Sequence, residues 1–201
     1  MRVTISHPTF AGSRVASPIL RTERLILRPP TPADAPAIVN YYSLNADFLA
    51  PWEPSKPRDF YTVPFWERQA RDIQREFEHG SAVRFFLHPN TGDPRIIGYV
   101  SYSQIVRRAA QYCVLGYSLG ADCEGRGLMT EALRESIRWV FQDLGLHRIS
   151  ANYMPHNRRS GNVLRRLGFA VEGYARDYLF INGRWEDHVL AALTNPAWQP
   201  Q

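Results

Sequence analysis

Apolar residues recur every three or four positions in two stretches, and this spacing predicts amphipathic helices at about Val63–His79 and Met129–Gly145. The apolar stripe of the second consists of Met129, Leu133, Ile137, Val140, Phe141 and Leu144. Two further helices are expected. One covers about Thr31–Asn45 and opens with Thr-Pro, a favourable first turn, and the other covers Asn157–Leu167.

Alternation of apolar and polar positions predicts the strands. They are expected at Glu23–Arg28, Ala82–His88, Ile96–Val106, Gln111–Leu119, Arg148–Tyr153, Phe169–Ile181 and Trp185–Leu193. Turn residues at Pro89–Gly92 predict an antiparallel meander in the middle of the chain, and Asn182-Gly183 predicts a hairpin near its end. The proline-rich stretch Ala50–Tyr61 is expected to be a loop.

These elements predict an α+β domain, in which helices pack on a mixed, mostly antiparallel sheet of about seven strands. The domain is expected over residues 21–194, between an irregular extension, 1–20, and a short tail, 195–201. The chain has 201 residues, 44% of them hydrophobic, which is enough for one sizeable core.

Composition narrows the environment and the chemistry. The sequence contains no run of ~18 uncharged apolar residues, so no membrane-spanning helix is expected. The first twenty residues lack the apolar segment of a secretory signal. We therefore expect a cytoplasmic protein without membrane contact, in which Cys113 and Cys123 are reduced thiols. The net charge is +5, and Lys56 is the only lysine, so the positive charge is almost entirely arginine. The planar guanidinium group of arginine binds phosphate groups well, either those of a cofactor or those of RNA.

The junction Tyr117–Leu133 carries the most specific chemistry: a strand, a loop with Gly125 and Gly127, and a helix. A helix start directs several unpaired N–H groups and a positive dipole at one point, so it can hold a phosphate group. Glycines let the main chain approach such a ligand closely. Taken alone, this motif is weak evidence for phosphate binding, because many glycine pairs near helix starts are only turns.

The loop resembles the pyrophosphate-binding motif Gln/Arg-x-x-Gly-x-Gly/Ala of the GCN5-related N-acetyltransferase (GNAT) family. Here it reads Glu-Gly-Arg-Gly-Leu-Met over Glu124–Met129, and its first and last residues depart from the general pattern. The segments His147–Ser160, Leu167–Asp177, Pro51–Pro54 and Arg184–Leu190 resemble the branch of the family that acetylates ribosomal proteins. The resemblance runs from about Arg21 to the C-terminus.

The resemblance implies the GNAT fold, in which a central pair of strands splays apart and acetyl-CoA binds as co-substrate, its pantetheine arm between the splayed strands. The residues implied in cofactor binding are Leu115, Tyr117, Leu119, Glu124, Gly125, Arg126, Gly127, Leu128, Met129, Thr130, Asn157 and Ser160. For the three strand side chains, ordinary packing is the alternative, and Asn157 also suits a helix N-cap. Arg126 is the arginine best placed for a phosphate; Arg158, Arg159, Arg165 and Arg166 are expected to form a solvated helix face.

Catalysis needs a group that serves the leaving thiolate and one that deprotonates the amine. Related enzymes often carry a tyrosine at the position of Leu164, so the resemblance favours Ser160 as the acid, with a capping hydroxyl as the alternative. The candidate bases are Glu53, Glu172, Asp177 and His188. Asp177 is preferred by analogy with an acidic residue on the corresponding strand of a sister enzyme.

Trp52 and Glu53 are candidates for binding the substrate ammonium, through an aromatic face and a carboxylate; a packing loop is the alternative. We expect no metal, because His147 and His156 lack the spacing of a zinc pair, and no acetyl-cysteine, because neither cysteine has a neighbouring histidine.

The resemblance implies that the acceptor is the N-terminal amine of a small-subunit ribosomal protein beginning with Ala or Ser. A small-molecule amine, such as an aminoglycoside or polyamine, is an alternative acceptor. A ribosome-assembly factor that contacts RNA, and so the ribosomal particle, is the alternative of a different class. Monomer and dimer are both open.

Overall fold

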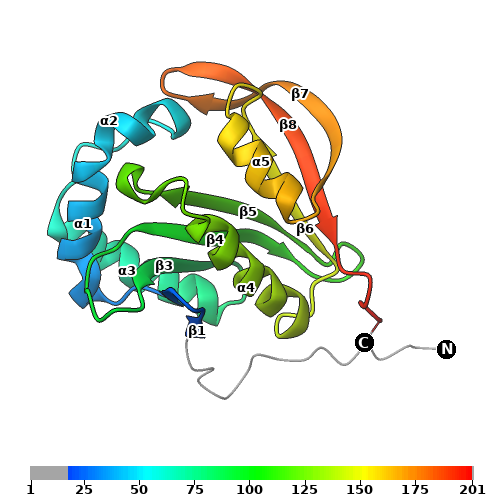
Figure 1. Ribbon diagram of the computed structural model, residues 1–201, viewed down its shortest axis with the longest axis horizontal. Helices are drawn as coiled ribbons and strands as arrows, with labels where there is room; N and C mark the ends of the chain where they lie inside the picture. Colours follow the sequence, from blue (N-terminus) through cyan, green and yellow to red (C-terminus); the bar gives the residue numbers. More distant parts are fainter. Residues whose placement is uncertain (1–17, 201) are drawn as a thin grey trace.

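The computed structural model describes residues 18–200, so most of the extension expected at 1–20 lies outside the described residues. An eight-stranded sheet runs through the described chain in the order β1-β2-β3-β4-β5-β6-β8-β7 (Figure 1). The strands are β1 (Leu20–Arg21), β2 (Leu25–Arg28), β3 (Val83–Pro89), β4 (Gly98–Val106), β5 (Tyr112–Leu119), β6 (Arg148–Tyr153), β7 (Ala170–Ile181) and β8 (Arg184–Thr194). Among the described strands, only β5 and β6 pair in parallel. The expected α+β class and mostly antiparallel sheet are confirmed, with the short β1 as an additional strand.

The helices follow the predicted pattern with shifted ends. They are α1 (Ala35–Leu44), α2 (Ala46–Leu49), α3 (Val63–Glu78), α4 (Leu128–Gln142) and α5 (Arg158–Arg166), with 3-10 turns η1 (Pro32–Asp34), η2 (Ala50–Trp52) and η3 (Ala121–Cys123). The first helix begins as η1, where the Asp34 carboxylate accepts from both the N–H and the hydroxyl of Thr31. The expected loop at 50–61 contains η2.

The sheet has a hydrophobic cluster on each face. On one face, Val100 and Tyr102 of β4 pack with the apolar stripe of α4 and with Leu164 of α5. On the other, Tyr99 of the same strand packs against a cluster formed largely by α1 and α3. Alternate residues of one strand thus serve opposite layers, as the pleat requires.

The two central strands diverge. The β5–β6 pairing runs only from Tyr112↔Arg148 to Leu115↔Ala151. Beyond that point β5 stays paired with β4 as far as Leu119, and β6 stays paired with β8 as far as Tyr153. Each strand therefore has an unpaired edge facing the other past Leu115 and Ala151, which confirms the expected splay.

The last two strands form the predicted hairpin. Asn182 and Gly183 both have positive φ, +46° and +83°, which is the backbone of a tight hairpin turn. Figure 1 shows the tip of this hairpin leaning toward α2. The segment after β8 is tied down, since the Trp198 indole donates to the Gly145 carbonyl at 3.0 Å. Among the described residues, no helix is both long and apolar enough to cross a membrane.

Candidate active site

The glycine-containing loop between β5 and α4 has the backbone expected of a phosphate-binding site. We call residues 120–127 the nest loop, and its two glycines together with the first N–H groups of α4 the nest. Gly125 and Gly127 both adopt left-handed φ, +74° and +75°. Gly127 is the N-cap of α4, and no side chain caps that helix start. Since the first N–H groups of a helix have no partner within it, those of Leu128–Thr130 remain available to a ligand. The Met129 side chain is buried in the core, so this residue can offer only its backbone.

An open hollow of about 580 Å³ adjoins this loop. Its lining comprises Glu23, Arg24, Gly125, Gly127, Thr130, Glu131, Arg134 and Arg166. A Cβ built on Gly125 meets nothing within 4 Å, so the space beside this backbone is free. The arginines of the hollow are Arg24, Arg134 and Arg166, whereas the favoured Arg126 is exposed and is not part of the lining.

A clamp between the β1–β2 turn and α4 holds the nest; we define it as Thr22 and Arg24 of the turn and Glu131 of α4. The Glu131 carboxylate on the first turn of α4 accepts from the Thr22 hydroxyl at 2.6 Å and from the Arg24 N–H at 2.9 Å. The Arg24 guanidinium donates to the same carboxylate at 2.6 Å and to the Arg126 carbonyl at 2.9 Å. Burial acts to raise the Glu131 pKa, but these hydrogen bonds outweigh it and the pKa is lowered.

Helix α1 holds the other side of the same loop. The buried Asn45 side chain accepts from the Ala121 N–H at 2.9 Å and donates to the Tyr41 carbonyl at 2.8 Å. The Tyr41 and Ser118 hydroxyls lie 2.8 Å apart. The nest is thus supported from both faces of the sheet, by residues far away in the sequence.

Helix α5 begins beside the diverging strands. Asn157 is its N-cap and accepts from the Ser160 N–H at 3.1 Å, as the capping interpretation predicted. Glu124 of the nest loop forms an ion pair at 2.8 Å with Arg159, whose side chain is exposed as expected of a solvated helix face. Leu164 is buried in the core and offers no proton.

Among the described residues, the Ser160 hydroxyl has one hydrogen-bond partner, the phenol of Tyr117. The two hydroxyl oxygens are 2.7 Å apart, and the Tyr117 hydroxyl also lies 3.1 Å from the Ser160 carbonyl. Burial raises the pKa of Tyr117 to about 12, although the hydrogen bond with Ser160 acts to lower it. The phenol is therefore protonated at any physiological pH.

The candidate bases of the C-terminal strands have other partners than Ser160. Asp177 is exposed in a bulge of β7, where its N–H donates to Asp187. Glu172 forms an ion pair with Arg148, and the buried His188 ring contacts the Glu186 carbonyl. Within the part of the chain that the structure describes, none of the three has a hydrogen bond or ion pair to Ser160 or to the nest.

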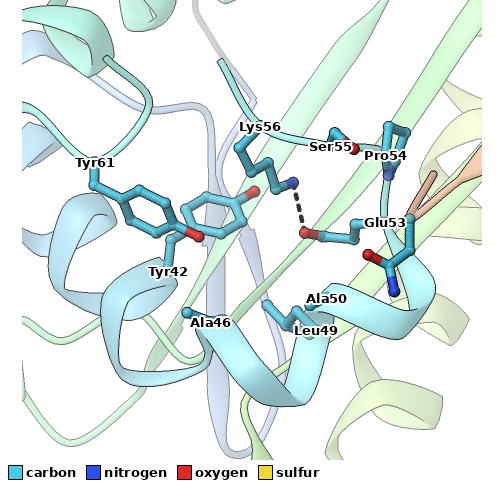
Figure 2. A pocket seen from close by; sticks show the side chains of 10 residues that line it. Tyr42, Ala46, Leu49, Ala50, Glu53, Pro54, Ser55, Lys56 and Tyr61 are labelled. Atoms are coloured by element: carbon cyan, nitrogen blue, oxygen red, sulfur yellow. Dashed lines mark ion pairs between the residues drawn. The ribbon is translucent and has the colours of Figure 1, made fainter. Parts of the chain in front are cut away.

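Glu53 lies in a second pocket, of about 300 Å³, between α2 and the hairpin tip. The pocket is lined by Tyr42, Ala46, Leu49, Ala50, Glu53, Pro54, Ser55, Lys56, Tyr61 and Asn182. Figure 2 shows Glu53 reaching toward Lys56, whose Nζ lies 2.6 Å from Oε2, and the other carboxylate oxygen accepts from the Tyr99 hydroxyl at 3.3 Å. The Lys56 ammonium also lies 4.6 Å from the centre of the Phe60 ring.

Trp52 and Glu53 are neighbours in sequence but contact different partners. The Trp52 ring packs against His156, with ring centres 5.4 Å apart, and it is not part of the Glu53 pocket. His156 directly precedes the cap of α5. Trp52 thus connects the segment after α2 to the start of α5. Trp52 and Glu53 do not line the same pocket.

Residues 18–200 contain no cluster of three His, Cys, Asp or Glu side chains suited to a metal ion. Cys113 and Cys123 are both buried, and burial raises the pKa of Cys113 to about 12, so its thiolate is not available.

Several residues that shape this site were missed from the sequence. Arg24, Glu131, Asn45 and Tyr41 gave no local signal, because their partners are far away along the chain. The Tyr117 hydroxyl was also missed, since an alternating strand pattern shows the face of a side chain but not what its end contacts. Lys56 had one available signal: it is the only lysine in the sequence.

Comparisons with known proteins agree with this geometry. A family model described as an acetyltransferase (GNAT) domain matches residues 24–170. The [ribosomal protein uS5]-alanine N-acetyltransferase of Escherichia coli is 45% identical over 188 residues, which cover 94% of this chain and 96% of that protein.

Two solved structures are similar over most of their length. The ribosomal-protein-S5-alanine acetyltransferase from Vibrio fischeri has a TM-score of 0.86 and 38% identity, and the match covers 90% of this chain and 99% of that one. Mycobacterium smegmatis RimJ, solved in complex with CoA-disulfide, has a TM-score of 0.81 and 29% identity, with 92% and 89% covered.

Proposed function

The chain belongs to the GNAT acetyltransferase family, and from that premise we propose that it transfers an acetyl group from acetyl-CoA to the N-terminal amine of a ribosomal protein. The preferred acceptor is a small-subunit protein that begins with alanine or serine. Such an acceptor implies a cytoplasmic reaction. The transfer is direct, within a complex of the chain, acetyl-CoA and the acceptor, because both thiols are buried.

One observation carries the proposal: the near full-length similarity, at 45% identity, to an enzyme named for acetylating the alanine of ribosomal protein uS5. A fold alone supports many acceptors. Similarity that extends over 94% of this chain also includes the loops and the hairpin around the diverging strands, where an acceptor would bind.

The residues of the nest fit the pyrophosphate of acetyl-CoA. Two left-handed glycines, an uncapped helix start and the free space beside Gly125 together form a cradle that a side chain would fill. Arg24, Arg134 and Arg166 add positive charge around the hollow, which suits phosphate groups. When bound, acetyl-CoA supplies the thioester that is attacked. Asn157 and the unpaired edge of β5 are the proposed contacts of the pantetheine arm.

The chain's chemical contribution is modest because the acceptor is reactive. A free N-terminal amine has a pKa of about 7.7–8.0, so at neutral pH a weak base or a water molecule is sufficient to deprotonate it. We retain Asp177 as a candidate base on analogy alone. The Ser160 hydroxyl is the proposed donor to the leaving sulfur, since Leu164 has no proton to give.

The Glu53 pocket bears on the choice of acceptor. It lies on the α1–α3 face of the sheet, opposite the face covered by α4. A polyamine or aminoglycoside would favour a broad acidic cleft, yet the only acidic residue of this pocket, Glu53, is already paired with Lys56. This arrangement argues against a polycation as the acceptor.

The test uses purified chain, acetyl-CoA and synthetic peptides that carry the N-terminal residues of small-subunit ribosomal proteins. We expect mass spectrometry to find one acetyl group on the α-amine of peptides that begin with alanine or serine. Peptides blocked at the N-terminus with an internal lysine, and spermidine, are the controls. Equal or faster acetylation of spermidine would reject the proposed acceptor.

A further inference from the structure

We propose that Tyr117 is a positioning residue for Ser160: its phenol donates to the Ser160 hydroxyl and so directs the hydrogen of that hydroxyl toward the leaving sulfur. This inference rests on the proposed acetyl transfer, and it assigns a role to a side chain rather than to the backbone of β5.

The contact joins two elements across the line where the sheet divides. Tyr117 lies two residues beyond Leu115, the last residue of β5 that pairs with β6. Ser160 is on the first turn of α5, which follows β6 in the chain. The 2.7 Å contact between the two hydroxyls therefore connects β5 to α5 where the strands have separated. The thioester of a cofactor arm between these strands would be beside this pair.

Hydrogen counting allows two arrangements of this pair: the phenol donates to the Ser160 carbonyl and accepts from the serine hydroxyl, or it donates to the serine hydroxyl. The proposal selects the second, along the shorter of the two contacts. Each hydroxyl has one hydrogen, and the Tyr117 oxygen lies within reach of both the Ser160 hydroxyl and the Ser160 carbonyl. If Tyr117 donates to the hydroxyl oxygen, the serine hydrogen is free to point at a third atom. A chain of two such bonds also polarises the serine, which strengthens its donation to a developing thiolate.

The protonation state of Tyr117 supports this role. Because burial raises its pKa to about 12, the phenol remains a donor throughout the working range of the enzyme and does not act as a base. Ser160 is only half-buried, so its free hydrogen can meet a ligand.

Two other tyrosine–serine pairs show what a purely structural contact looks like. The hydroxyls of Tyr102 and Ser136 lie 2.9 Å apart, and both residues are fully buried between β4 and α4. Tyr41 and Ser118 form a buried pair that supports the nest loop. Of the three, only the Tyr117–Ser160 pair joins β5 to α5, the helix that follows β6, which makes Tyr102 a matched control.

The proposed step balances. The acceptor nitrogen attacks the carbonyl carbon, the C–N bond forms, and the C–S bond breaks with its electron pair going to sulfur. An ammonium acceptor loses two protons overall, one of which ends on the sulfur and the other in solvent. Tyr117 and Ser160 end as they began, having stabilised the negative charge on sulfur while it lasts.

The kinetic test compares Tyr117→Phe with Tyr102→Phe. Losing one hydrogen bond of this kind should lower kcat about tenfold in Tyr117→Phe, with the KM for acetyl-CoA within about twofold. Tyr102→Phe should keep both values and lose only thermal stability. In a Ser160→Ala background, Tyr117→Phe should cause no further loss, because the phenol acts through the serine. Additive losses would overturn the proposal, as would an unchanged kcat in Tyr117→Phe.

A binding measurement tests the Tyr117–Ser160 pair without any acceptor, so its result is valid even if the proposed acceptor is wrong. The thiol of bound CoA is titrated with pH by the ultraviolet absorbance of its thiolate. We expect a lower thiol pKa in the wild-type and Tyr102→Phe complexes than in Tyr117→Phe and Ser160→Ala. Equal thiol pKa values in all four complexes would overturn the role of Tyr117, whatever the acceptor is.

Discussion

At the scale of single residues, the site depends on two glycines in the left-handed region. Gly125 and Gly127 turn the backbone of the nest loop toward one point, and neither could carry a side chain there without strain. The proposed ligand would occupy the space beside Gly125, where a Cβ would have no neighbour within 4 Å. The backbone strain caused by a side chain at Gly125 can therefore be separated experimentally from its obstruction of the ligand.

We expect Gly125→Ala to weaken acetyl-CoA binding about tenfold or more, because the added methyl group enters the proposed phosphate cradle. Gly92→Ala is the matched control: Gly92 also has positive φ, +83°, and open space, but lies in the turn before β4. Both variants should lose about 1 kcal/mol of stability from the backbone alone. Titration calorimetry that finds the same affinity in both would contradict the nest assignment.

The pH dependence follows from the acceptor and not from Tyr117. We expect kcat/KM for a peptide acceptor to rise with pH through about 8, as the α-amine loses its proton. It should then stay level to about pH 10, because the Tyr117 pKa is raised to about 12 by burial and the phenol keeps its proton there. A fall below pH 10 that disappears in Tyr117→Phe would show that the phenol ionises in the working range.

At the scale of elements, the nest is held by contacts that join β2, α1 and α4. The clamp of Thr22, Arg24 and Glu131 connects the turn before β2 to the first turn of α4 and to the Arg126 carbonyl. Hydrogen bonds to charged groups are stronger than neutral ones, so this clamp should matter for the shape of the loop.

Arg24→Met should raise the dissociation constant of acetyl-CoA about tenfold while kcat stays within about twofold, since the clamp shapes the cofactor loop and does not touch the reacting atoms. Arg95→Met is the comparison, because Arg95 pairs with Asp93 and Asp122 at similar exposure and donates to no carbonyl of the nest. If both variants bind acetyl-CoA equally well, the clamp does not position the nest.

Most elements could be predicted because their signals are local. The stripe of α4, the Asn182-Gly183 turn and the meander of β3, β4 and β5 are all as expected, within a few residues at their ends. The position of β8 between β6 and β7 could not be predicted, because strand pairing depends on contacts far apart in sequence. The Arg24–Glu131 pair was missed for the same reason: 107 positions separate its members.

At the scale of the whole molecule, the sheet separates two kinds of binding surface. The phosphate nest and its arginines lie with α4 on one face, and the Glu53 pocket lies with α1, α2 and the hairpin tip on the other. The diverging strands β5 and β6 lie between them. An acetyl group presented from one side could thus meet an amine from the other, which is the arrangement that direct transfer needs.

The most direct test of the account is an intact-mass comparison of small-subunit ribosomal proteins from cells with and without this chain. The account predicts that one protein with an N-terminal alanine or serine gains 42 Da, one acetyl group, at its α-amine only when the chain is present, and that the Gly125→Ala variant restores this modification poorly. Identical masses in the two cell lines would contradict it.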